Sequence, residues 1–307
     1  MAILVLPTSS FVAAQLEALR RLAPLEIILT DPDSAVPQDV EAILAYKLPP
    51  GLAARFPNLA FVASAGAGVD ELVAQVPAHV PVTRAADPMQ AMRMAQYVAM
   101  TVLRWHRELP RYEAQQHSRE WQRAPAEPEE RWIVGLMGYG ALGRTVGASL
   151  RSLGYPVRAW TRTLHPSPDV ALFAGPDALP AFLAGTRVLV CLLPLTPATQ
   201  NLLDAATLDG LPQGAYLVNV SRGGVLDELA LLRALSSGRL AGAALDVYSQ
   251  EPLPAASPLW DEPRLLLTPH VAATLRPDFA VRQFLANLER ARHSHPLEHV
   301  VDRARGY

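Results

Sequence analysis

A glycine-rich turn between two segments of contrasting pattern constrains the fold more than any other feature of this chain. The turn is Gly138-Tyr139-Gly140-Ala141-Leu142-Gly143. A short apolar segment at 131–137 precedes it, and a helical pattern at 141–153 follows directly. A strand that enters a helix through a tight turn is typical of a βαβ unit. The turn therefore indicates an α/β fold.

The same alternation of strand and helix patterns continues along most of the 307 residues. Short, continuously apolar segments predict strands that are buried on both faces of a parallel sheet. They lie at 2–6, 25–29, 42–45, 59–62, 131–137, 157–160, 187–192, 215–218, 241–245 and 265–267. Amphipathic segments at 11–22, 141–153, 227–236 and 278–292 predict helices. We therefore predict an α/β protein of two doubly wound, Rossmann-like domains with parallel sheets and a cleft between them.

Composition and charge argue against several classes of protein. A net charge of -2 gives no electrostatic reason to expect a nucleic acid or an anionic membrane as partner. No apolar segment is long enough to span a bilayer, and the N-terminus lacks the basic region of a signal peptide. Because Cys191 is the only cysteine, no internal disulfide can form, and we expect a cytoplasmic location and a buried, unreactive thiol. The histidines near the C-terminus have no neighbouring cysteine, so we expect no metal site.

The glycine-rich turn has the spacing of a dinucleotide-binding site. Gly138 permits the tight turn, Gly140 lets a pyrophosphate approach the backbone, and Gly143 allows close packing of helix and strand. The N-terminus of the following helix offers free N–H groups and a partial positive charge to the phosphates. We therefore predict that residues 138–143 bind a nicotinamide dinucleotide; a tight turn without a ligand is the alternative.

The next strand ends in Trp160-Thr161-Arg162-Thr163, which bears on the choice of cofactor. Arg162 lies 19 residues after Gly143, where an NAD-preferring site carries an acid that binds the ribose hydroxyls. A guanidinium between two hydroxyls suits the 2′-phosphate of NADP instead. We predict NADPH as the preferred cofactor, with NADH possible. The alternative is that Arg162 is a solvated surface arginine.

Three late segments supply groups for hydride transfer to a 2-keto acid, which needs a held carboxylate, a polarised carbonyl and a proton donor. Arg222 follows the strand at 215–218, Glu251 follows the strand at 241–245, and His270 follows the strand at 265–267. Residues beyond the carboxyl ends of parallel strands meet at one edge of the sheet. We therefore expect these three side chains to converge.

Several ordered motifs together carry a resemblance to a known family. They are Ala65-Gly66-Ala67-Gly68-Val69-Asp70, Met94-Ala95-Gln96-Tyr97, the turn at 138–143, Leu193-Pro194-Leu195-Thr196-Pro197, Asn219-Val220-Ser221-Arg222-Gly223-Gly224, Ala244-Leu245-Asp246-Val247 and Thr268-Pro269-His270. With these motifs the chain resembles the D-isomer-specific 2-hydroxyacid dehydrogenases over nearly its whole length. The glyoxylate/hydroxypyruvate reductase branch is the most similar.

The resemblance implies a role for each of the three converging residues. Arg222 would clamp the substrate carboxylate and carbonyl oxygen through its planar fork. His270 would donate the proton during reduction and accept it during oxidation. Glu251 would bond the other ring nitrogen, fix the ring and favour its protonated form.

The resemblance also implies residues around the cofactor and the substrate. Leu193, Pro194 and Asp246 would join the cofactor site, with Asp246 facing the nicotinamide carboxamide. The backbone N–H groups around Ala67, Gly68 and Val69 would bind the substrate carboxylate, because glycine permits close approach.

The residues that choose the substrate are less constrained. Tyr46 and Lys47 end the strand at 42–45, and we expect their loop to face the cleft. Lys47, the only lysine, could attract an anionic substrate or be a surface residue. Related reductases often carry an aromatic residue followed by histidine here, so the departure leaves the preference for substrate side chains open. Trp121 could reach the cleft of a neighbouring subunit or pack on the surface.

The segment after Asp87-Pro88 predicts the boundary between the domains. Asp87 can cap a helix whose first turn contains Pro88, and a polar, proline-containing stretch at 123–130 suggests a loop after that helix. We predict a flavodoxin-like substrate domain at 1–98, completed by 277–307, and an NAD(P)-binding Rossmann domain at 99–276.

These inferences converge on one predicted function. We expect a homodimeric, NADPH-preferring reductase of small 2-keto acids, which converts glyoxylate to glycolate and hydroxypyruvate to D-glycerate. One alternative is an NAD-dependent dehydrogenase of a bulkier D-2-hydroxy acid. An alternative from another class is a dinucleotide-sensing interaction protein.

Overall fold

The computed structural model describes residues 1–164 and 167–303. The chain divides into two compact units, one made of Met1–Pro88 with Leu275–Tyr307 and the other of Met89–Thr274. The predicted boundary at 98/99 falls inside the helix α3 (Gln90–His106), which lies wholly in the second unit. Residues 304–307 of the predicted completing segment lie outside the described residues.

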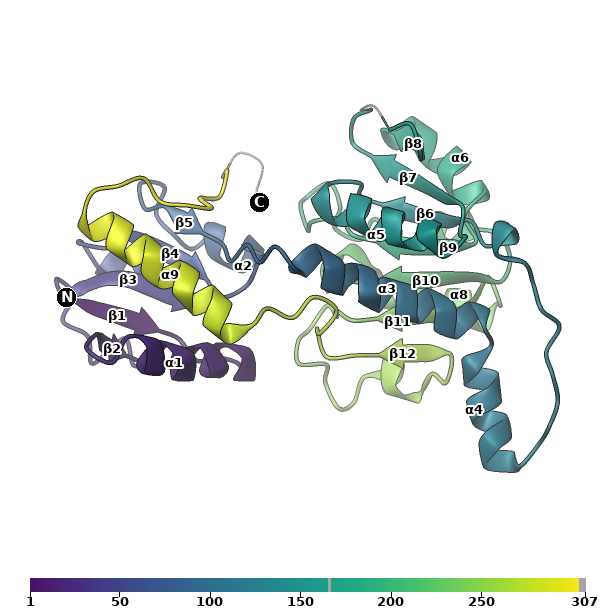
Figure 1. Cartoon of the computed structure of the whole chain (residues 1–307), viewed down its shortest axis with the longest axis horizontal. Coiled ribbons are helices and arrows are strands. Elements are labelled where there is room, and N and C mark those ends of the chain that lie inside the picture. The colour runs from purple at the N-terminus through teal and green to yellow at the C-terminus, as the bar shows by residue number, and fades with distance from the viewer. Residues whose placement is uncertain (165–166, 304–307) are drawn as a thin grey trace. The chain divides into compact units, whose positions relative to one another are not determined.

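The first unit is built on a five-stranded sheet within the described residues, with strand order β2-β1-β3-β4-β5 and every pair parallel. The strands are β1 (Ala2–Val5), β2 (Ile27–Leu29), β3 (Val40–Ala45), β4 (Phe61–Ser64) and β5 (Val82–Thr83). The helical elements are α1 (Ser10–Leu22), η1 (Ala53–Arg55), α2 (Asp70–Val73) and α9 (Pro277–Arg292). In Figure 1 the first and last helices, α1 in purple and α9 in yellow, lie side by side against this sheet.

The side chains of β1 show why the sheet needs cover on both faces. Ile3 and Val5 pack in a cluster with apolar residues of α1 and α9. Leu4, and Leu6 just after the strand, belong to a different cluster, which includes Leu72 of α2. Successive side chains of a strand point to opposite faces, so a strand buried on both faces must be apolar throughout. This explains the continuous apolar segments in the sequence.

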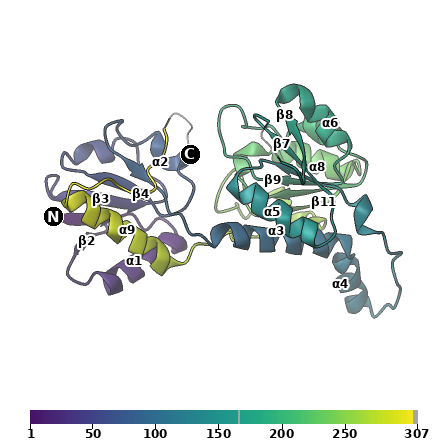
Figure 2. The same ribbon diagram turned by 45° about the horizontal axis from the view of Figure 1, so that its top comes forward.

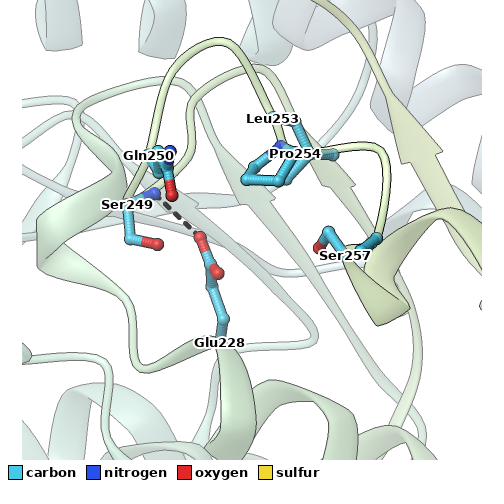
Figure 3. Close-up of a pocket in the computed structure, with 7 residues that line it drawn as sticks. Glu228, Ser249, Gln250, Leu253, Pro254 and Ser257 are labelled. Carbon is cyan, nitrogen blue, oxygen red and sulfur yellow. Dashed lines mark hydrogen bonds between the residues drawn. The ribbon is translucent and has the colours of Figure 1, made fainter.

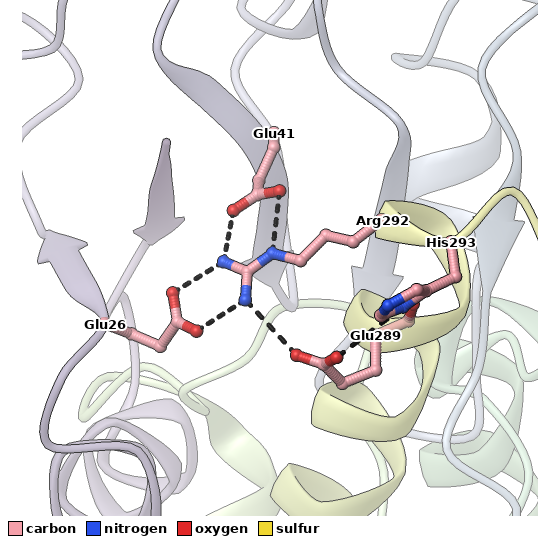
Figure 4. Close-up of polar contacts among 5 residues, drawn as sticks. All are labelled: Glu26, Glu41, Glu289, Arg292 and His293. Atoms are coloured by element: carbon pink, nitrogen blue, oxygen red, sulfur yellow. Dashed lines mark hydrogen bonds and ion pairs between the residues drawn. The ribbon is translucent and has the colours of Figure 1, made fainter.

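An ion cluster around Arg292 fixes the end of α9 to the sheet (Figure 4). Its guanidinium bonds both oxygens of Glu26 at 2.7 Å and both oxygens of Glu41 at 2.6 and 3.2 Å. Glu41 belongs to β3 and is only 4% exposed. Because a buried carboxylate needs a partner, Arg292 ties the last helix to the strands formed by the first residues.

The second unit contains a seven-stranded parallel sheet in the part of the chain that is described, with strand order β12-β11-β10-β9-β6-β7-β8. Its strands are β6 (Val134–Met137), β7 (Val157–Thr161), β8 (Ala171–Ala174), β9 (Val188–Cys191), β10 (Ala215–Asn219), β11 (Leu240–Leu245) and β12 (Leu265–Leu267). The chain runs outward from β6 to β8 on one side, then returns and runs from β9 to β12 on the other. Ligands of open α/β sheets bind at such a reversal of strand order.

Helices cover both faces of this second sheet. The α-helices are α3 (Gln90–His106), α4 (Leu109–Ser118), α5 (Ala141–Ser152), α6 (Leu179–Ala184), α7 (Ala205–Asp209) and α8 (Glu228–Ser236), and the short 3-10 turns are η2 (Glu129–Arg131), η3 (Pro176–Ala178), η4 (Gly223–Val225) and η5 (Pro258–Asp261). Figure 2 shows α3 and α5 side by side on one face, with α6 and α8 on the other. The predicted fold class, two doubly wound parallel α/β sheets, is confirmed.

Two local predictions were incomplete or wrong. The short strands β5 and β8 were not predicted, because β5 has two residues and the residues of β8 are all at least partly exposed. The prediction that Asp87 caps the following helix is wrong, because that helix begins at Gln90 with Met89 as its N-cap. Asp87 is instead buried, with 5% exposure. No helix among the residues described is long and apolar enough to cross a membrane.

Candidate active site

The glycine-rich turn lies between β6 and α5, at the reversal of strand order, and its three glycines have separate uses. Gly138 has φ +102, a conformation that side chains other than glycine's rarely adopt. A Cβ on Gly140 would have no neighbour within 4 Å, so the backbone there is open to approach. A Cβ on Gly143 would lie 2.2 Å from the Gly138 carbonyl oxygen. This open backbone at a helix N-terminus fits the pyrophosphate of a dinucleotide.

The other predicted residues around the turn divide into buried and accessible groups. Tyr139 is 8% exposed and its ring packs against Gly147, so its side chain belongs to the core. Ala141 and Leu142 form the first turn of α5. Leu193 packs beside Gly138, and the Pro194 carbonyl accepts a bond from the Thr199 hydroxyl at 2.6 Å.

The end of β7 leaves one charged side chain accessible. The Trp160 indole donates to the Gly175 carbonyl at 2.8 Å, and the Thr161 hydroxyl donates to the Thr163 carbonyl at 2.9 Å. Both side chains therefore build the turn that follows the strand. Arg162, between the two threonines, is exposed. An exposed guanidinium just after the second strand of the unit has the chemistry to bind a ribose phosphate.

His270 and Glu251 form a bonded pair after the strands β12 and β11. His270 Nδ1 lies 2.8 Å from Glu251 Oε2, and Glu251 Oε1 accepts from the Tyr248 amide at 3.1 Å. Burial alone would raise the pKa of Glu251, but the hydrogen bond and charge of His270 and the Tyr248 amide outweigh burial and hold this pKa below its usual value. The side chains are 37% and 28% exposed, so a solute can reach the histidine. The pair uses Nδ1, so proton exchange with a solute falls to Nε2.

Arg222 follows β10, and its loop presses against the loop that carries Glu251. Its Nη1 donates to the Ser221 carbonyl at 2.8 Å. At Gly223, an added Cβ would lie 1.8 Å from the carbonyl carbon of Tyr248. Only glycine permits this approach, so residue 223 sets the spacing between the two loops. The structure therefore brings the segments of Arg222, Glu251 and His270 to the same edge of the sheet, as their positions after neighbouring strands predicted.

A second contact, which the sequence did not reveal, holds the same loop. Glu228, in the first turn of α8, accepts a bond from the Ser249 amide at 2.8 Å (Figure 3). The two residues line a pocket of about 260 Å³ together with Gln250, Leu253, Pro254 and Ser257. Gly223 and Glu228 therefore position the backbone immediately before Glu251.

Asp246, at the end of β11, is 1% exposed and bonded through both carboxylate oxygens. Oδ1 accepts from the Thr268 hydroxyl at 2.6 Å and the Val271 amide at 2.8 Å, and Oδ2 accepts from the Ala272 amide at 2.8 Å. Burial raises the pKa of Asp246, and the three hydrogen bonds and His270 offset only part of that increase. The contact of Asp246 with a nicotinamide stays a prediction.

The predicted substrate residues of the first unit lie together around a loop. The Ser64 hydroxyl donates to the Gly68 carbonyl at 2.6 Å and folds the loop back on β4. Ala67 and Gly68 are partly exposed, whereas the Val69 side chain is buried. The Tyr46 ring packs against this loop, where a Cβ on Gly66 would lie 3.5 Å from it. Lys47, the next residue, is exposed.

Within residues 1–164 and 167–303, no group of three or more His, Cys, Asp or Glu side chains could hold a metal ion. Cys191 is fully buried and bonded to the Ser221 hydroxyl at 3.2 Å. Burial raises the pKa of the Cys191 thiol, and the expected burial of this residue is confirmed.

Comparison with known proteins identifies the family. Residues 99–272 match the model for the NAD-binding domain of D-isomer-specific 2-hydroxyacid dehydrogenases. The chain belongs to this family. It is 41% identical over 257 residues to the glyoxylate/hydroxypyruvate reductase A of Salmonella newport, a match that covers 81% of this chain and 82% of that protein.

Two solved structures extend the likeness to the full length of the chain. The D-isomer-specific 2-hydroxyacid dehydrogenase of Xanthobacter autotrophicus, in complex with NADPH and MES, has a TM-score of 0.87 and 39% identity, over 100% of this chain and 99% of that one. The NADPH-dependent glyoxylate/hydroxypyruvate reductase of Sinorhizobium meliloti, in complex with NADP and sulfate, has a TM-score of 0.89 and 32% identity, over 100% of both chains. The predicted family, its reductase branch and the prediction of an enzyme are confirmed.

Proposed function

We propose that this dehydrogenase-family chain is an NADPH-preferring reductase of small 2-keto acids, with glyoxylate and hydroxypyruvate as substrates and glycolate and D-glycerate as products. The observation that carries the proposal is the bonded His270–Glu251 pair, held beside the Arg222 loop at one edge of an NAD-binding domain. Relatives named for this activity support the choice of substrates.

The proposed cofactor site combines the glycine-rich turn with Arg162. The turn at 138–143 would hold the pyrophosphate, and Arg162 would pair with the 2′-phosphate that distinguishes NADPH from NADH. Leu193, Pro194 and Asp246 complete the proposed site. When bound, NADPH supplies the hydride that reduces the keto carbon. The two solved relatives in complex with NADPH or NADP support this choice.

Arg222, His270 and Glu251 would share the remaining tasks, which are substrate binding and proton transfer. Arg222 would hold the substrate carboxylate and polarise the carbonyl oxygen with its planar fork. His270 would donate the Nε2 proton to the oxygen that becomes the hydroxyl, and would take it back when the reaction runs toward oxidation. Glu251, kept ionised, would orient the ring through Nδ1 and stabilise the protonated form before transfer.

The first unit would supply further contacts to the substrate. The N–H groups around Ala67, Gly68 and Val69 are proposed to bind its carboxylate, because two of these residues are accessible and the loop is held in shape by Ser64. Tyr46 borders this loop, and the exposed Lys47 adds positive charge for an anion.

We also propose a cytoplasmic homodimer. The second unit exposes large apolar side chains at Met100, Leu109 and Trp121, with exposures of 47%, 45% and 95%. They lie on α3, at the start of α4 and after α4, and exposed apolar side chains of this size favour a protein contact. Sedimentation velocity tests the dimer, and a monomer at micromolar concentration would overturn it.

The proposed function is tested by steady-state rates with NADPH and NADH across a panel of 2-keto acids. We expect the highest kcat/KM with NADPH and glyoxylate or hydroxypyruvate. Arg162→Ala should raise the KM for NADPH roughly tenfold and leave that for NADH unchanged. Better turnover with NADH and a bulkier acid would favour an NAD-dependent dehydrogenase. Tight NADPH binding without turnover of any acid would favour a dinucleotide sensor.

A further inference from the structure

The backbone of His270 is held in an uncommon conformation. Its φ is 57°, in the left-handed region that residues other than glycine rarely adopt. A residue keeps such a backbone only when its surroundings fix it. Because the backbone conformation limits which side-chain rotamers are allowed, whatever fixes φ at His270 also restricts where the imidazole can point.

Asp246 supplies that fixation from the neighbouring strand. Its backbone carbonyl accepts from the His270 amide at 2.9 Å. Its two carboxylate oxygens accept from the amides of Val271 and Ala272, each at 2.8 Å. Asp246 therefore accepts hydrogen bonds from three consecutive N–H groups, that of the strained His270 and those of the two residues after it.

The carboxylate of Asp246 is itself held by a chain of two hydroxyls. Thr268 Oγ1 donates to Asp246 Oδ1 at 2.6 Å, and Tyr97 Oη lies 2.5 Å from Thr268 Oγ1. Since the threonine hydroxyl has a single proton and gives it to Asp246, Tyr97 is the donor to Thr268. Burial raises the pKa of Tyr97 to about 12, so its hydroxyl keeps its proton across the range of enzymatic assays.

We propose that Tyr97 and Thr268 are positioning residues for the acid–base histidine: their hydroxyls lock the Asp246 carboxylate onto the amides that follow His270. This proposal rests on the proposed function of His270. It also gives a role to Tyr97, the last residue of the Met94-Ala95-Gln96-Tyr97 motif in α3.

The Thr268 main chain has an independent anchor, so the contribution of its hydroxyl can be isolated. Tyr248 Oη lies 2.9 Å from the Thr268 carbonyl oxygen and 3.0 Å from the Leu245 carbonyl oxygen, and its single proton is shared between these two acceptors. Thr268→Val keeps the shape of the side chain and this anchor but removes the donor to Asp246. Thr268→Ser keeps the donor and removes only a methyl group.

The test compares kcat, KM and NADPH affinity in Thr268→Val, Thr268→Ser, Tyr97→Phe and the double variant of Thr268→Val with Tyr97→Phe. We expect Thr268→Val to lower kcat roughly tenfold with the KM for the keto acid within about twofold, because the acid is misdirected while Arg222 and the turn at 138–143 stay in place. Thr268→Ser should restore most of the rate. The double variant should match Thr268→Val alone, since Tyr97 acts only through Thr268.

A tyrosine elsewhere in the same unit serves as the matched control. The Tyr112 hydroxyl accepts from the Ala124 amide at 2.9 Å and has no part in the proposed chain. Tyr112→Phe should leave kcat unchanged. Wild-type kcat in Thr268→Val, or additive losses in the double variant, would overturn the proposed positioning role.

Amide hydrogen exchange tests the same chain without any turnover. Thr268→Val should speed the exchange of the Val271 and Ala272 amides roughly tenfold, because their acceptor becomes free to move. Unchanged exchange rates of these two amides in Thr268→Val would refute the proposed role of the Thr268 hydroxyl in holding Asp246. If the wild-type protein turns over no 2-keto acid but this exchange still accelerates, the proposed function fails and the structural part of the inference stands.

Discussion

Gly223→Ala is the substitution whose effect the structure defines most sharply. The added Cβ would lie 1.8 Å from the Tyr248 carbonyl carbon, 1.9 Å from its oxygen and 2.3 Å from the Ser249 nitrogen. Carbon atoms in contact stay about 3.5–4.0 Å apart, so the loop must retreat by roughly 1 to 2 Å. These neighbours are backbone atoms, and they cannot rotate away as a side chain can.

This displacement of the loop begins at Tyr248 and would reach Glu251, three residues later. The Tyr248 amide bonds Glu251 Oε1 at 3.1 Å, so a shift of the loop draws the carboxylate away from His270 Nδ1. A bond of 2.8 Å that lengthens by more than 1 Å is lost, and a misplacement of about 1 Å in a catalytic group costs on the order of 100-fold in rate. We therefore expect kcat to fall roughly 100-fold.

The assay is steady-state reduction of hydroxypyruvate with saturating NADPH, beside thermal unfolding and NADPH titration. Gly224→Ala is the matched control, because the nearest atoms to its Cβ belong to the flexible Leu195 side chain, at 3.2 Å and beyond. We expect this control to keep kcat within about threefold of wild type. If Gly223→Ala binds NADPH normally and keeps wild-type kcat, then the contact between these loops does not position Glu251.

Three further perturbations follow from contacts elsewhere in the chain. Gly143→Ala should destabilise the protein and abolish NADPH binding, because its Cβ would lie 2.2 Å from the Gly138 oxygen. Gly140→Ala should unfold at the wild-type temperature and lose only NADPH affinity. Calorimetry measures the unfolding temperature and titration measures NADPH affinity, so together they distinguish the two effects. Arg292→Met should lower the free energy of unfolding by about 3 kcal/mol in urea denaturation, since it leaves the buried Glu41 carboxylate without its partner. Hydrogen bonding to Arg292 holds the pKa of Glu26 below its usual value, against the opposing effect of burial. The resulting stabilisation of the folded state is complete above about pH 4.3, the pKa of glutamate in the unfolded chain. It is lost as the pH falls through the lower pKa that Glu26 has in the folded protein. Unfolding temperatures between pH 6 and 3 should therefore fall more steeply in the wild type than in Arg292→Met.

The sequence predicted the parts of this protein that depend on burial and strand order. Strands such as β9 (Val188–Cys191) are buried on both faces, so they appear as continuous apolar segments. Arg222, Glu251 and His270 each follow such a strand, and parallel topology places the ends of neighbouring strands at one edge. The turn at 138–143 requires glycines for steric reasons that hold in any chain of this fold.

The parts that sequence reasoning missed depend on contacts between distant residues. Tyr97 and Thr268 are 171 residues apart, and no local pattern marks a tyrosine of an amphipathic helix as a partner of a strand end. Thr268, directly before Pro269-His270, was the one local feature of the sequence that indicated a contact near the histidine. Strand β8 (Ala171–Ala174) escaped notice because its residues are partly exposed and few. Asp87 has the residue type of a helix N-cap, but in the structure its side chain is buried and does not cap the helix.

The measurement that tests the central claim most directly is the reduction of hydroxypyruvate by wild-type protein and His270→Gln, with NADPH affinity determined for both. Glutamine keeps a polar side chain but cannot deliver a proton at neutral pH. Loss of a general acid should lower kcat by roughly 10²- to 10⁴-fold, while NADPH affinity stays within about twofold, because the turn at 138–143 is untouched. A wild-type rate in His270→Gln would contradict the assignment of His270 as the proton donor.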